Sequence, residues 1–441
     1  MDCPPKVREV MDRLENNGYP CFLVGGCVRD YLLGKMPHDY DIVTPASVHD
    51  IKRCFDRVLT IGERHGTLGV IIDNRLIEVS TFRGNPGLNG AAALRDDLAN
   101  RDFTINAIAM DRREILYDPW GGAQDLAQGI IRSTGGRGAR LFSDDPLRML
   151  RAIRLHAVYG FAIEDGTWQE ILQLKGLLAL TAPERIREEF NRILLSERPG
   201  QGVRMLYKSG LLQYIVPELI PAAGFDQRSY HHDRDVLEHS LAALDNTSPR
   251  LPLRLAALLH DVAKPVCFSL DEWGKGHFYG HHVVGSNMAN VIMSRLRYDW
   301  QTTEKVSSLI RAHMSRFEKL RDRSLKKLIV EVGQDNIEDL LELQRADIIA
   351  SAPPADFTSL NQLDEEIRRI IDEGIPLQRS DLAVTGEDLI SLGYRPGPEL
   401  GRTLQVLLDI VLDDPLRNER DLLLEIARGR LDKLAVNGTA D

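Results

Sequence analysis

The chain has 441 residues, of which 43% are hydrophobic, and its formal net charge is -10 at pH 7. This length predicts roughly two to four domains, and no apolar run reaches the roughly 18 residues that a membrane-spanning helix requires. The charged N-terminus has no apolar signal core, and the five cysteines are scattered without a C-x-x-C pair. We therefore expect a cytoplasmic protein with no membrane partner, disulfide framework or cysteine zinc site.

Arginines gather in one segment of this acidic chain. The net charge argues against nucleic acid, because phosphate contacts require lysine and arginine, but the distribution of charge matters more than its sum. Two acids oppose the arginines of residues 132–154, whereas acids concentrate at 335–342, 364–373 and 409–425. The arginines are Arg132, Arg137, Arg140, Arg148, Arg151 and Arg154. This pattern predicts a local basic channel on an acidic protein.

The first informative segment is 21–43, CFLVGGCVRDYLLGKMPHDYDIV, which follows a predicted helix over 5–18. An apolar run predicts a strand that ends at Gly25–Gly26, where backbone N–H groups can approach a phosphate. A second predicted strand carries Asp39 and Asp41, whose side chains point the same way because strand residues alternate. Neighbouring carboxylates repel unless a cation lies between them, and Mg²⁺ binds carboxylates together with phosphates. A surface turn with two solvated acids is the simpler alternative.

The pattern G-G-x-V-R-D followed by D-x-D resembles the first motif of class II tRNA nucleotidyltransferases and bacterial poly(A) polymerases. The resemblance implies an α+β fold: an N-terminal polymerase-beta-like mixed sheet with helices, then a mostly all-α neck, a body with an HD-type domain, and a tail. In that family the two aspartates bind the catalytic metals, so Asp39 and Asp41 are expected to hold two Mg²⁺ ions. Gly25, Gly26 and Arg29 are expected to bind the nucleotide.

Three further strands are predicted at 58–61, 69–72 and 76–82, after a helix for which Ser47 is the expected N-cap. Glu78 lies in the last of these runs among apolar neighbours. An isolated acid in such a place more often occupies an edge face of the sheet. The family resemblance instead makes it a candidate third catalytic carboxylate.

The segment 98–111, LANRDFTINAIAMD, resembles the R-R-D-F-T-I-N-A motif of the same family. The resemblance implies that Arg101 and Asp102 contact the triphosphate or ribose of the nucleotide. Asn100 stands where the family has its first arginine, which leaves the role of that position open. A turn at 118–122 closes the expected catalytic domain.

The next predicted helix, 144–159, contains an acid and an arginine three residues apart, Asp145 and Arg148. Such a pair can present acceptors and donors in one plane, as reading a base edge requires, although a surface ion pair is the simpler interpretation. In the resembled family, E-D-x-x-R selects CTP or ATP without a nucleic-acid template; Asp144 replaces the usual glutamate. Arginines spaced by three form one cationic ridge expected to bind nucleotide: Arg148, Arg151 and Arg154.

Helical patterns continue to the C-terminus. In the segment 183–195, which resembles the next family motif, Glu184 and Arg187 are expected to brace the preceding helix. The segment 382–411 resembles the helical tail of bacterial CCA-adding enzymes. The expected domains are a catalytic head (1–125), a neck with the nucleotide template (126–205), an HD-containing body (206–350) and a tail that binds tRNA (351–441).

A second set of candidate metal ligands lies in the helical region: His239, His260, Asp261, His281 or His282, His313 and Asp347. Histidine and carboxylate ligands suit a transition-metal or magnesium phosphohydrolase site. The series resembles the HD superfamily, which implies a second divalent metal, although such domains are sometimes purely structural. Adjacent His260 and Asp261 can face one metal only if the helical turn is irregular. Histidines that simply pack between helices are the alternative.

Together the resemblances imply a tRNA nucleotidyltransferase that extends the tRNA 3′ end from CTP and ATP. Ten residues, 84–93, stand where CCA-adding relatives carry a longer, charged loop, and CC-adding relatives lack that loop. Both CCA addition and CC addition with a separate A-adding enzyme therefore stay open. A poly(A) polymerase, an HD phosphohydrolase and a non-catalytic RNA-binding protein are further alternatives, and the sequence indicates no oligomeric state.

Overall fold

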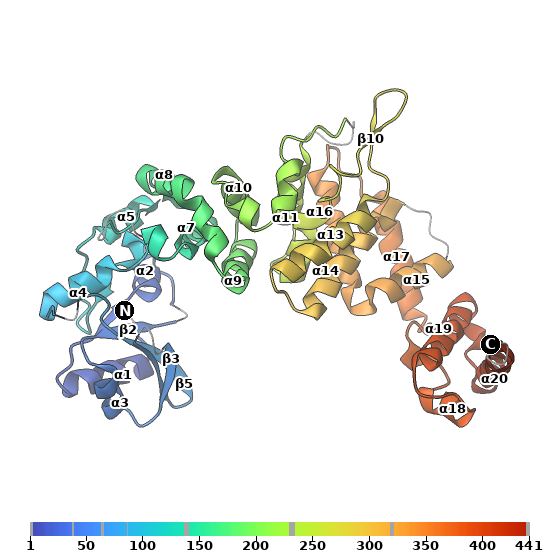
Figure 1. The fold of residues 1–441 in the computed structure, drawn as a ribbon, viewed down its shortest axis with the longest axis horizontal. Coiled ribbons are helices and arrows are strands. Elements are labelled where there is room, and N and C mark those ends of the chain that lie inside the picture. The colour runs from blue at the N-terminus through green and yellow to red at the C-terminus, as the bar shows by residue number, and fades with distance from the viewer. Residues whose placement is uncertain are drawn as a thin grey trace. The chain divides into compact units, whose positions relative to one another are not determined.

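The computed structural model of the chain describes residues 3–37, 39–62, 66–85, 87–135, 141–228, 234–317 and 322–437. The chain divides into two compact units, Met1–Pro217 and Glu218–Asp441, here called unit 1 and unit 2. Unit 1 contains a seven-stranded sheet, and unit 2 is mostly helical (Figure 1). The predicted α+β fold class is thus confirmed, whereas the finer head, neck, body and tail boundaries stay predictions.

The sheet of unit 1 has the strand order β3-β4-β5-β2-β1-β6-β7. Its strands are β1 (Phe22–Val24), β2 (Asp41–Thr44), β3 (Val58–Gly62), β4 (Thr67–Ile72), β5 (Arg75–Thr81), β6 (Ala109–Met110) and β7 (Leu116–Tyr117). Strand β2 runs parallel to β5, and the other pairs are antiparallel. The mixed sheet places Asp41 opposite Glu78.

Alternation along the central strands builds a core on each face of the sheet. Leu23 and Ile42 pack in one core with α1 (Pro5–Asn16) and α3 (Val48–Cys54). Their neighbours Val24 and Val43 pack in the other core with α4 (Gly90–Ala99). Asp41 and Val43 are two residues apart on β2, so their side chains lie on the same face of the sheet, the one that α4 covers. Ser47 caps α3 through a capping box with Asp50, as predicted.

The remaining elements of unit 1 are helical apart from one small parallel pair. They are α2 (Gly26–Leu32), η2 (Thr104–Asn106), α5 (Gly122–Gln128), β8 (Ile130–Ile131), α6 (Leu141–Asp144), α7 (Leu147–Tyr159), β9 (Ala162–Ile163), α8 (Asp165–Leu174), η3 (Lys175–Leu180), α9 (Pro183–Leu194), α10 (Pro199–Lys208) and η4 (Leu212–Tyr214). Helix α7 packs against α9 and α10.

The helix predicted over 144–159 is wrong in one respect, because it is broken between α6 and α7. Pro146 lies at the break. Proline has no backbone N–H and disfavours helical dihedrals for the residue before it, which is Asp145. The break separates Asp144 from Asp145, so the two neighbouring acids are not on one continuous helix.

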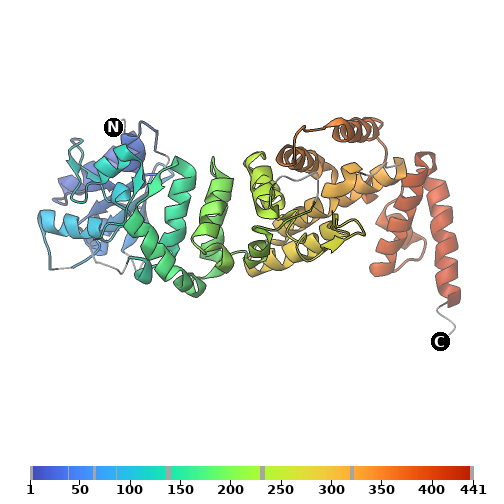
Figure 2. The same ribbon diagram turned by 90° about the horizontal axis from the view of Figure 1, so that it is seen from above.

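Unit 2 consists of helices and one short hairpin. They are α11 (Val236–Asp245), α12 (Leu251–Leu259), β10 (Ser269–Leu270), β11 (Gly276–His277), α13 (His281–Arg295), α14 (Trp300–Ala312), η6 (His313–Phe317), α15 (Asp322–Val332), η7 (Gln334–Asn336), α16 (Ile337–Ala350), α17 (Thr358–Asp372), η8 (Arg379–Asp381), α18 (Gly386–Ser391), α19 (Pro398–Asp413), η9 (Pro415–Arg417) and α20 (Arg420–Asn437), with η5 (Pro217–Ala222) at its start. Helices α18, α19 and α20 gather at the C-terminal end of this unit (Figure 2). Over the part of the chain that is described, no helix combines the length and the apolar character needed to cross a membrane.

Candidate functional site

One cavity of about 510 Å³ in unit 1 collects nearly all the residues that the first motifs predicted. Those lining it are Gly25, Gly26, Arg29, Asp39, Asp41, Arg101, Asp102, Asp145, Arg148, Arg151 and Arg154. They come from segments as far apart as β2 and α7. The structure therefore brings this set together, and the chemical role of each member stays a prediction.

The two aspartates lie at the start of β2, on the cavity. Asp41 is the first residue of the strand, whereas Asp39 is exposed in the bend before it, so the predicted placement of both on one strand is wrong. Burial raises the pKa of Asp41, and the Asp39 charge adds to this rise while Arg101 opposes it. Paired carboxylates in such a place form an oxygen-rich donor set, which is what Mg²⁺ prefers.

Glu78 lies on β5, directly opposite Asp41 in the parallel register. Its side chain is exposed, as the edge-face interpretation expected, and it is not among the described residues that line the cavity. Partial desolvation by the surrounding protein raises the pKa of Glu78, and the charges of Asp41 and Asp39 raise it further. Glu78 is therefore close enough to sense both aspartates, and its catalytic role stays a prediction.

The glycine turn leaves room for a neighbouring arginine. Gly25 has φ 76°, which favours glycine, and precedes α2. A Cβ at Gly25 would lie 3.2 Å from Arg101 Nη1 and 3.6 Å from Asp41 Oδ2. The turn thus lets Arg101 approach the aspartate.

Arg29 is held in a buried polar network. Its Nη1 donates to Asn106 Oδ1 at 2.7 Å, and its Nη2 donates to the hydroxyl of Tyr159 at 2.7 Å. The Tyr159 hydroxyl in turn donates to Asp30 Oδ1 at 2.8 Å. These bonds tie α2 to η2 and to the C-terminal end of α7. They give Arg29 a structural role beside the predicted nucleotide contact.

Asp102 extends this network toward α7. Its Oδ1 accepts from Asn106 Nδ2 at 2.9 Å, and its Oδ2 accepts from Arg151 Nε at 2.7 Å. Burial alone would raise the pKa of Asp102, but the Arg151 charge and these bonds hold it well below its usual range. Asp102 therefore stays ionised and fixes the guanidinium of Arg151 at the cavity wall.

Asp145 and Arg148, the pair predicted to read a base, each contact a different residue in this structure. Asp145 Oδ2 lies 3.0 Å from Arg185 Nη2, a residue of α9 that the sequence analysis missed. Arg148 Nη2 donates to the backbone oxygen of Asn100 at 3.2 Å. Position 100 thus contributes its main chain here, and the Asn100 side chain donates to the backbone oxygen of Asp96 at 2.7 Å.

Glu189 of α9 is the second residue that sequence reasoning missed. It is buried, with its Oε2 2.8 Å from Arg154 Nε and its Oε1 3.9 Å from Arg151 Nη1. Arg192 Nη1 lies 3.7 Å from Glu189 Oε1. Helical spacing was the available signal, because residues 185, 189 and 192 share one face of α9.

The predicted basic channel is present, but the arginines that line it differ from the predicted set. Among the described residues, eight arginines line the cavity: Arg29, Arg83, Arg101, Arg148, Arg151, Arg154, Arg185 and Arg192. Arg132 is not among them, since it pairs with Asp125 at 3.1 Å. Arg137 and Arg140 lie outside the described residues.

The ten-residue segment at 84–93 is only partly a loop. Its last four residues, G-A-A-A, begin α4, because alanine favours helix, and residue 86 lies outside the described residues. The backbone N–H of Asn85 donates to Asp96 Oδ2 at 2.6 Å. The backbone N–H of Arg83 donates to buried Asp97 Oδ1 at 2.8 Å, which fastens the start of this short loop to α4.

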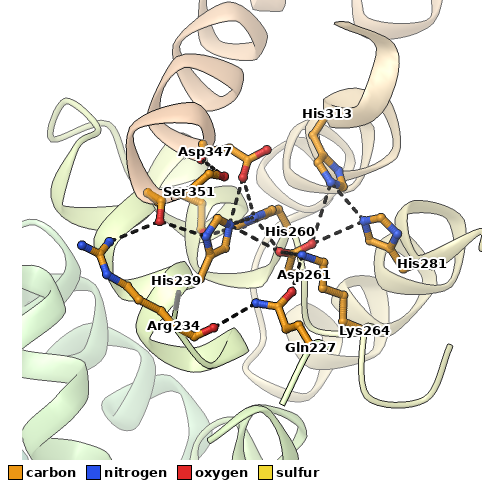
Figure 3. A network of polar contacts seen from close by, with 12 residues as sticks. Gln227, Arg234, His239, His260, Asp261, Lys264, His281, His313, Asp347 and Ser351 are labelled. Carbon is orange, nitrogen blue, oxygen red and sulfur yellow. Dashed lines mark hydrogen bonds and ion pairs between the residues drawn. The ribbon is translucent and has the colours of Figure 1, made fainter. Parts of the chain in front are cut away.

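The second predicted set of ligands also meets, within unit 2 (Figure 3). Asp261 lies within 4.0 Å of four histidines: His239, His260, His281 and His313. Asp347 Oδ1 lies 2.9 Å from His239 Nε2. Helix α12 ends at Leu259, so the adjacent His260 and Asp261 lie in the turn that follows the regular helix. His281, rather than His282, belongs to the cluster.

Three family models match the chain. Residues 21–132 match the "Poly A polymerase head domain" and residues 160–222 match the "Probable RNA and SrmB- binding site of polymerase A". Residues 284–427 match a model for domain 2 of tRNA nucleotidyltransferases. The head model covers the aspartates and the glycine turn.

Curated relatives cover most of the chain. The A-adding tRNA nucleotidyltransferase of Deinococcus radiodurans is 31% identical over 88% of this chain and 90% of its own length. The CC-adding enzyme of Thermus thermophilus is 32% identical over 88% of each chain, and the CCA-adding enzyme of Lactiplantibacillus plantarum is 28% identical over 96% and 95%.

A solved structure shows the same fold. The Bacillus stearothermophilus CCA-adding enzyme in complex with CTP has a TM-score of 0.71 to this chain, with 24% identity, over 99% of this chain and 100% of the other. The relatives, the family models and the fold agree with the motifs around Asp41. The chain therefore belongs to the class II tRNA nucleotidyltransferase family.

Proposed function

We propose that this chain transfers nucleotides from CTP to the 3′ end of tRNA, in the cytoplasm and without a nucleic-acid template. The observation that carries the proposal is the pair Asp39 and Asp41 on a cavity that eight of the described arginines line. In the reaction, the 3′ oxygen of the RNA forms a bond to the α-phosphorus and the bond from that phosphorus to the β-phosphate bridge breaks. The hydroxyl proton passes to solvent and pyrophosphate leaves.

Asp39 and Asp41 are the residues that would hold Mg²⁺. Their fit rests on the carboxylate oxygens and on the raised pKa of Asp41, which marks a place where added positive charge is favourable. Bound there, a pair of Mg²⁺ ions would supply charge for the attacking and leaving oxygens of an in-line displacement. Glu78, beside Asp41 in the sheet, would support the same site.

Arginines near the aspartates would hold the triphosphate. Arg101 lies next to Gly25 and Asp41, and Arg83 is close enough for its charge to act on Asp41. Guanidinium groups bind phosphate oxygens through several donors in a fixed plane. Fixed arginines therefore position the α-phosphate before the transfer, which is where most catalysis of phosphoryl transfer arises.

Asp145 and Arg148 would read the base. Arg148 is oriented by the backbone oxygen of Asn100, and Asp145 exchanges Arg185 for a base donor when the nucleotide enters. Arg151 and Arg154 are held by Asp102 and Glu189. Both arginines would thus form a rigid wall beside the base.

The helical segments would bind the acceptor and T arms of the tRNA through shape and backbone contacts.

A narrower proposal concerns the product: we propose that addition stops at CC and that a separate enzyme adds A. The short, uncharged segment at 84–93 favours this, because it stands where the family resemblance implies a longer, charged loop in CCA-adding enzymes.

The test is incubation of the purified chain with tRNA that lacks CCA, plus CTP alone, ATP alone or both, and sizing of the products to one nucleotide. The general proposal predicts extension from CTP that disappears in Asp41→Asn. No incorporation overturns it, and long A tails on generic RNA identify a poly(A) polymerase instead. Extension by two residues with both nucleotides supports the narrower proposal, whereas a third residue overturns the narrower proposal alone.

A further inference from the structure

We propose that the open half of the unit 1 sheet, formed by β3, β4 and β5, is the surface on which the 3′-terminal nucleotide of the RNA docks. The contacts would be made by Leu59, Ile61 and Leu76, here called the apolar strip. This inference rests on the proposed function and adds to it the position of the attacking strand. Three observations carry it: the packing of the sheet, its register, and the side of Asp41 on which the glycine turn lies.

The sheet is covered on one face over only part of its width. The core beneath α4 takes its described strand residues from β1, β2, β6 and β7, and no described residue of β3, β4 or β5 belongs to it. On the opposite face, β4 and β5 are buried in the core that contains α1 and α3, through residues such as Leu68, Val70 and Val79. Strands β3, β4 and β5 are therefore packed on one face and open on the other.

Large apolar side chains adjoin each other on the open face. Leu59 is 53% exposed, Ile61 is 48% exposed and Leu76 is 49% exposed. A Cβ at Gly69 of β4 would lie 2.5 Å from Leu76 Cδ1 and 2.6 Å from Ile61 Cδ1, so these two side chains meet over the glycine. Leu59 lies directly opposite Gly69 and so shares its face. Exposed apolar side chains are ordinary when scattered, whereas a contiguous group marks an interaction surface.

The sheet register connects the apolar strip to the aspartates. Glu78 lies opposite Asp41 on one side and opposite Gly69 on the other. Gly69 in turn lies opposite Leu59, so these residues form one row across β2, β5, β4 and β3. Neighbouring strands are about 4.8 Å apart, which places Gly69 about 10 Å from Asp41 along the row. A nucleotide whose 3′ oxygen reaches Asp41 can therefore lie over Glu78 and the strip.

The glycine turn indicates from which side the RNA arrives. Gly25 and Gly26 lie between β1 and α2, with Arg101 Nη1 beside the turn. Strand β1 adjoins β2 on the side away from β5. A triphosphate held at this turn would point its leaving pyrophosphate toward the β1 side of Asp41. In-line displacement places the attacking oxygen opposite the leaving one. The RNA would thus arrive from the β5 side, where the open face lies.

The chemistry of the open face suits a terminus whose base changes. The side chains of the apolar strip carry no hydrogen-bonding group, and the hydroxyls of Thr67 and Ser80 bond to each other at 2.9 Å. Apolar contact with the face of a base buries surface from water without reading the base edges. Each transfer leaves a new terminal nucleotide, so a surface without sequence preference is what repeated addition requires.

The first experiment locates the RNA terminus directly. The probe is tRNA that lacks CCA and carries 4-thiouridine as its 3′-terminal nucleotide, irradiated with the full chain in the absence of CTP. Mass spectrometry identifies the crosslinked peptides. We expect crosslinks to residues 59–61 or 69–78, and none there when the 4-thiouridine lies in the anticodon loop. Crosslinks of the terminal nucleotide to other residues alone overturn the inference, and irradiation needs no nucleotide transfer.

The second experiment removes the apolar strip in the variant Ile61→Ser with Leu76→Ser. Loss of a contact made equally before and during the reaction raises KM and leaves kcat unchanged. We expect KM for tRNA lacking CCA to rise about tenfold, which corresponds to about 1.4 kcal/mol, and KM for CTP to stay within about twofold. Leu116→Ser is the matched control, because Leu116 is 39% exposed on β7 at the other edge of the sheet. It should leave both KM values unchanged.

The outcomes separate this inference from the proposed function. An unchanged KM for tRNA in a double variant that still incorporates CTP overturns the inference alone. A parent that incorporates nothing overturns the proposed function, and the crosslinks then decide the surface by themselves. A parent that sediments as a dimer and a double variant that sediments as a monomer assign the strip to a second copy of the chain instead. Should the double variant not fold, Leu59→Ser takes its place, with an expected rise in KM of about threefold.

Discussion

The two polar clusters of this chain use carboxylates in opposite surroundings. In unit 1, Asp39 and Asp41 face a cavity whose wall carries eight of the described arginines, so a polyanion can enter and be held. Among the described residues of unit 2, Asp261 and Asp347 are buried beside histidines and Lys264. The comparison teaches that carboxylates lie beside guanidinium groups in unit 1, which suit a polyanion, and beside imidazoles in unit 2.

The largest expected effect is that of Asp41→Asn. Loss of this carboxylate removes a ligand for the ions that would stabilise the transferred charge, which is worth several kcal/mol, or about a thousandfold in rate. The measurement is the initial rate of labelled CTP incorporation into tRNA. An unchanged rate would contradict this role of Asp41.

The second effect concerns the arginine wall. Glu189→Gln leaves Arg154 without its buried carboxylate, whereas Arg151 keeps Asp102, and breaking a buried pair costs about 3–5 kcal/mol. We expect the free energy of unfolding of unit 1 to fall by an amount near the lower end of that range. The Arg154 side chain is 20% exposed, so solvent can partly compensate for the lost carboxylate. Urea denaturation measures it.

Glu188→Gln is the matched control for that experiment, since Glu188 is the exposed neighbour on the same helix. It should leave stability within about 0.5 kcal/mol of the parent. Equal effects of the two substitutions would contradict the role assigned to Glu189.

Sequence reasoning found what is local and missed what depends on packing. The glycine turn, the aspartates and the histidine series could be recognised because each lies in a short pattern or resembles a known motif. Arg185 pairs with Asp145 from 40 residues away, and that contact depends on how α9 lies against α7.

The same dependence on packing explains the predictions that were wrong. Pro146 breaks the expected helix near its start, yet the regular spacing of the arginines after it favoured one continuous element. Arg132 turned to Asp125 rather than the cavity, because the position of α5 relative to β8 decides its partner. The alanines that shorten the loop after Arg83 carried a helix signal that could have been read.

A smaller effect follows from the raised pKa of Asp41. An acid whose pKa is raised in the folded state contributes stability below its unfolded value, and that contribution is lost as pH rises through the folded value. At neutral pH without metal, Asp41→Asn should therefore raise the melting temperature of unit 1 by a few degrees at most, since about 1 kcal/mol corresponds to about 2–4 °C.

With Mg²⁺ present, the parent should have the higher melting temperature of the two proteins, because only the parent is stabilised by binding the ion at this site. Thermal melts with and without Mg²⁺ at pH 7 provide the comparison. A parent that is more stable than Asp41→Asn in the absence of Mg²⁺ would contradict the view that the site is electrostatically strained without cations.

The smallest expected effect is that of Asn100→Ala. Arg148 uses the backbone oxygen of this residue, which the substitution keeps, so CTP incorporation should stay within about threefold of the parent. The lost bond to Asp96 should cost about 0.5–1.5 kcal/mol of stability. A change in the preference for CTP over ATP would show instead that the Asn100 side chain contacts the nucleotide.

The most direct test of two separate sites compares three proteins in one assay of labelled CTP incorporation into tRNA lacking CCA. The parent and His281→Gln should incorporate CTP at the same rate, whereas Asp41→Asn should incorporate about a thousandfold less. Incorporation by Asp41→Asn at the parent's rate, or its loss in folded His281→Gln, would contradict the assignment of nucleotidyl transfer to the aspartates of unit 1 alone.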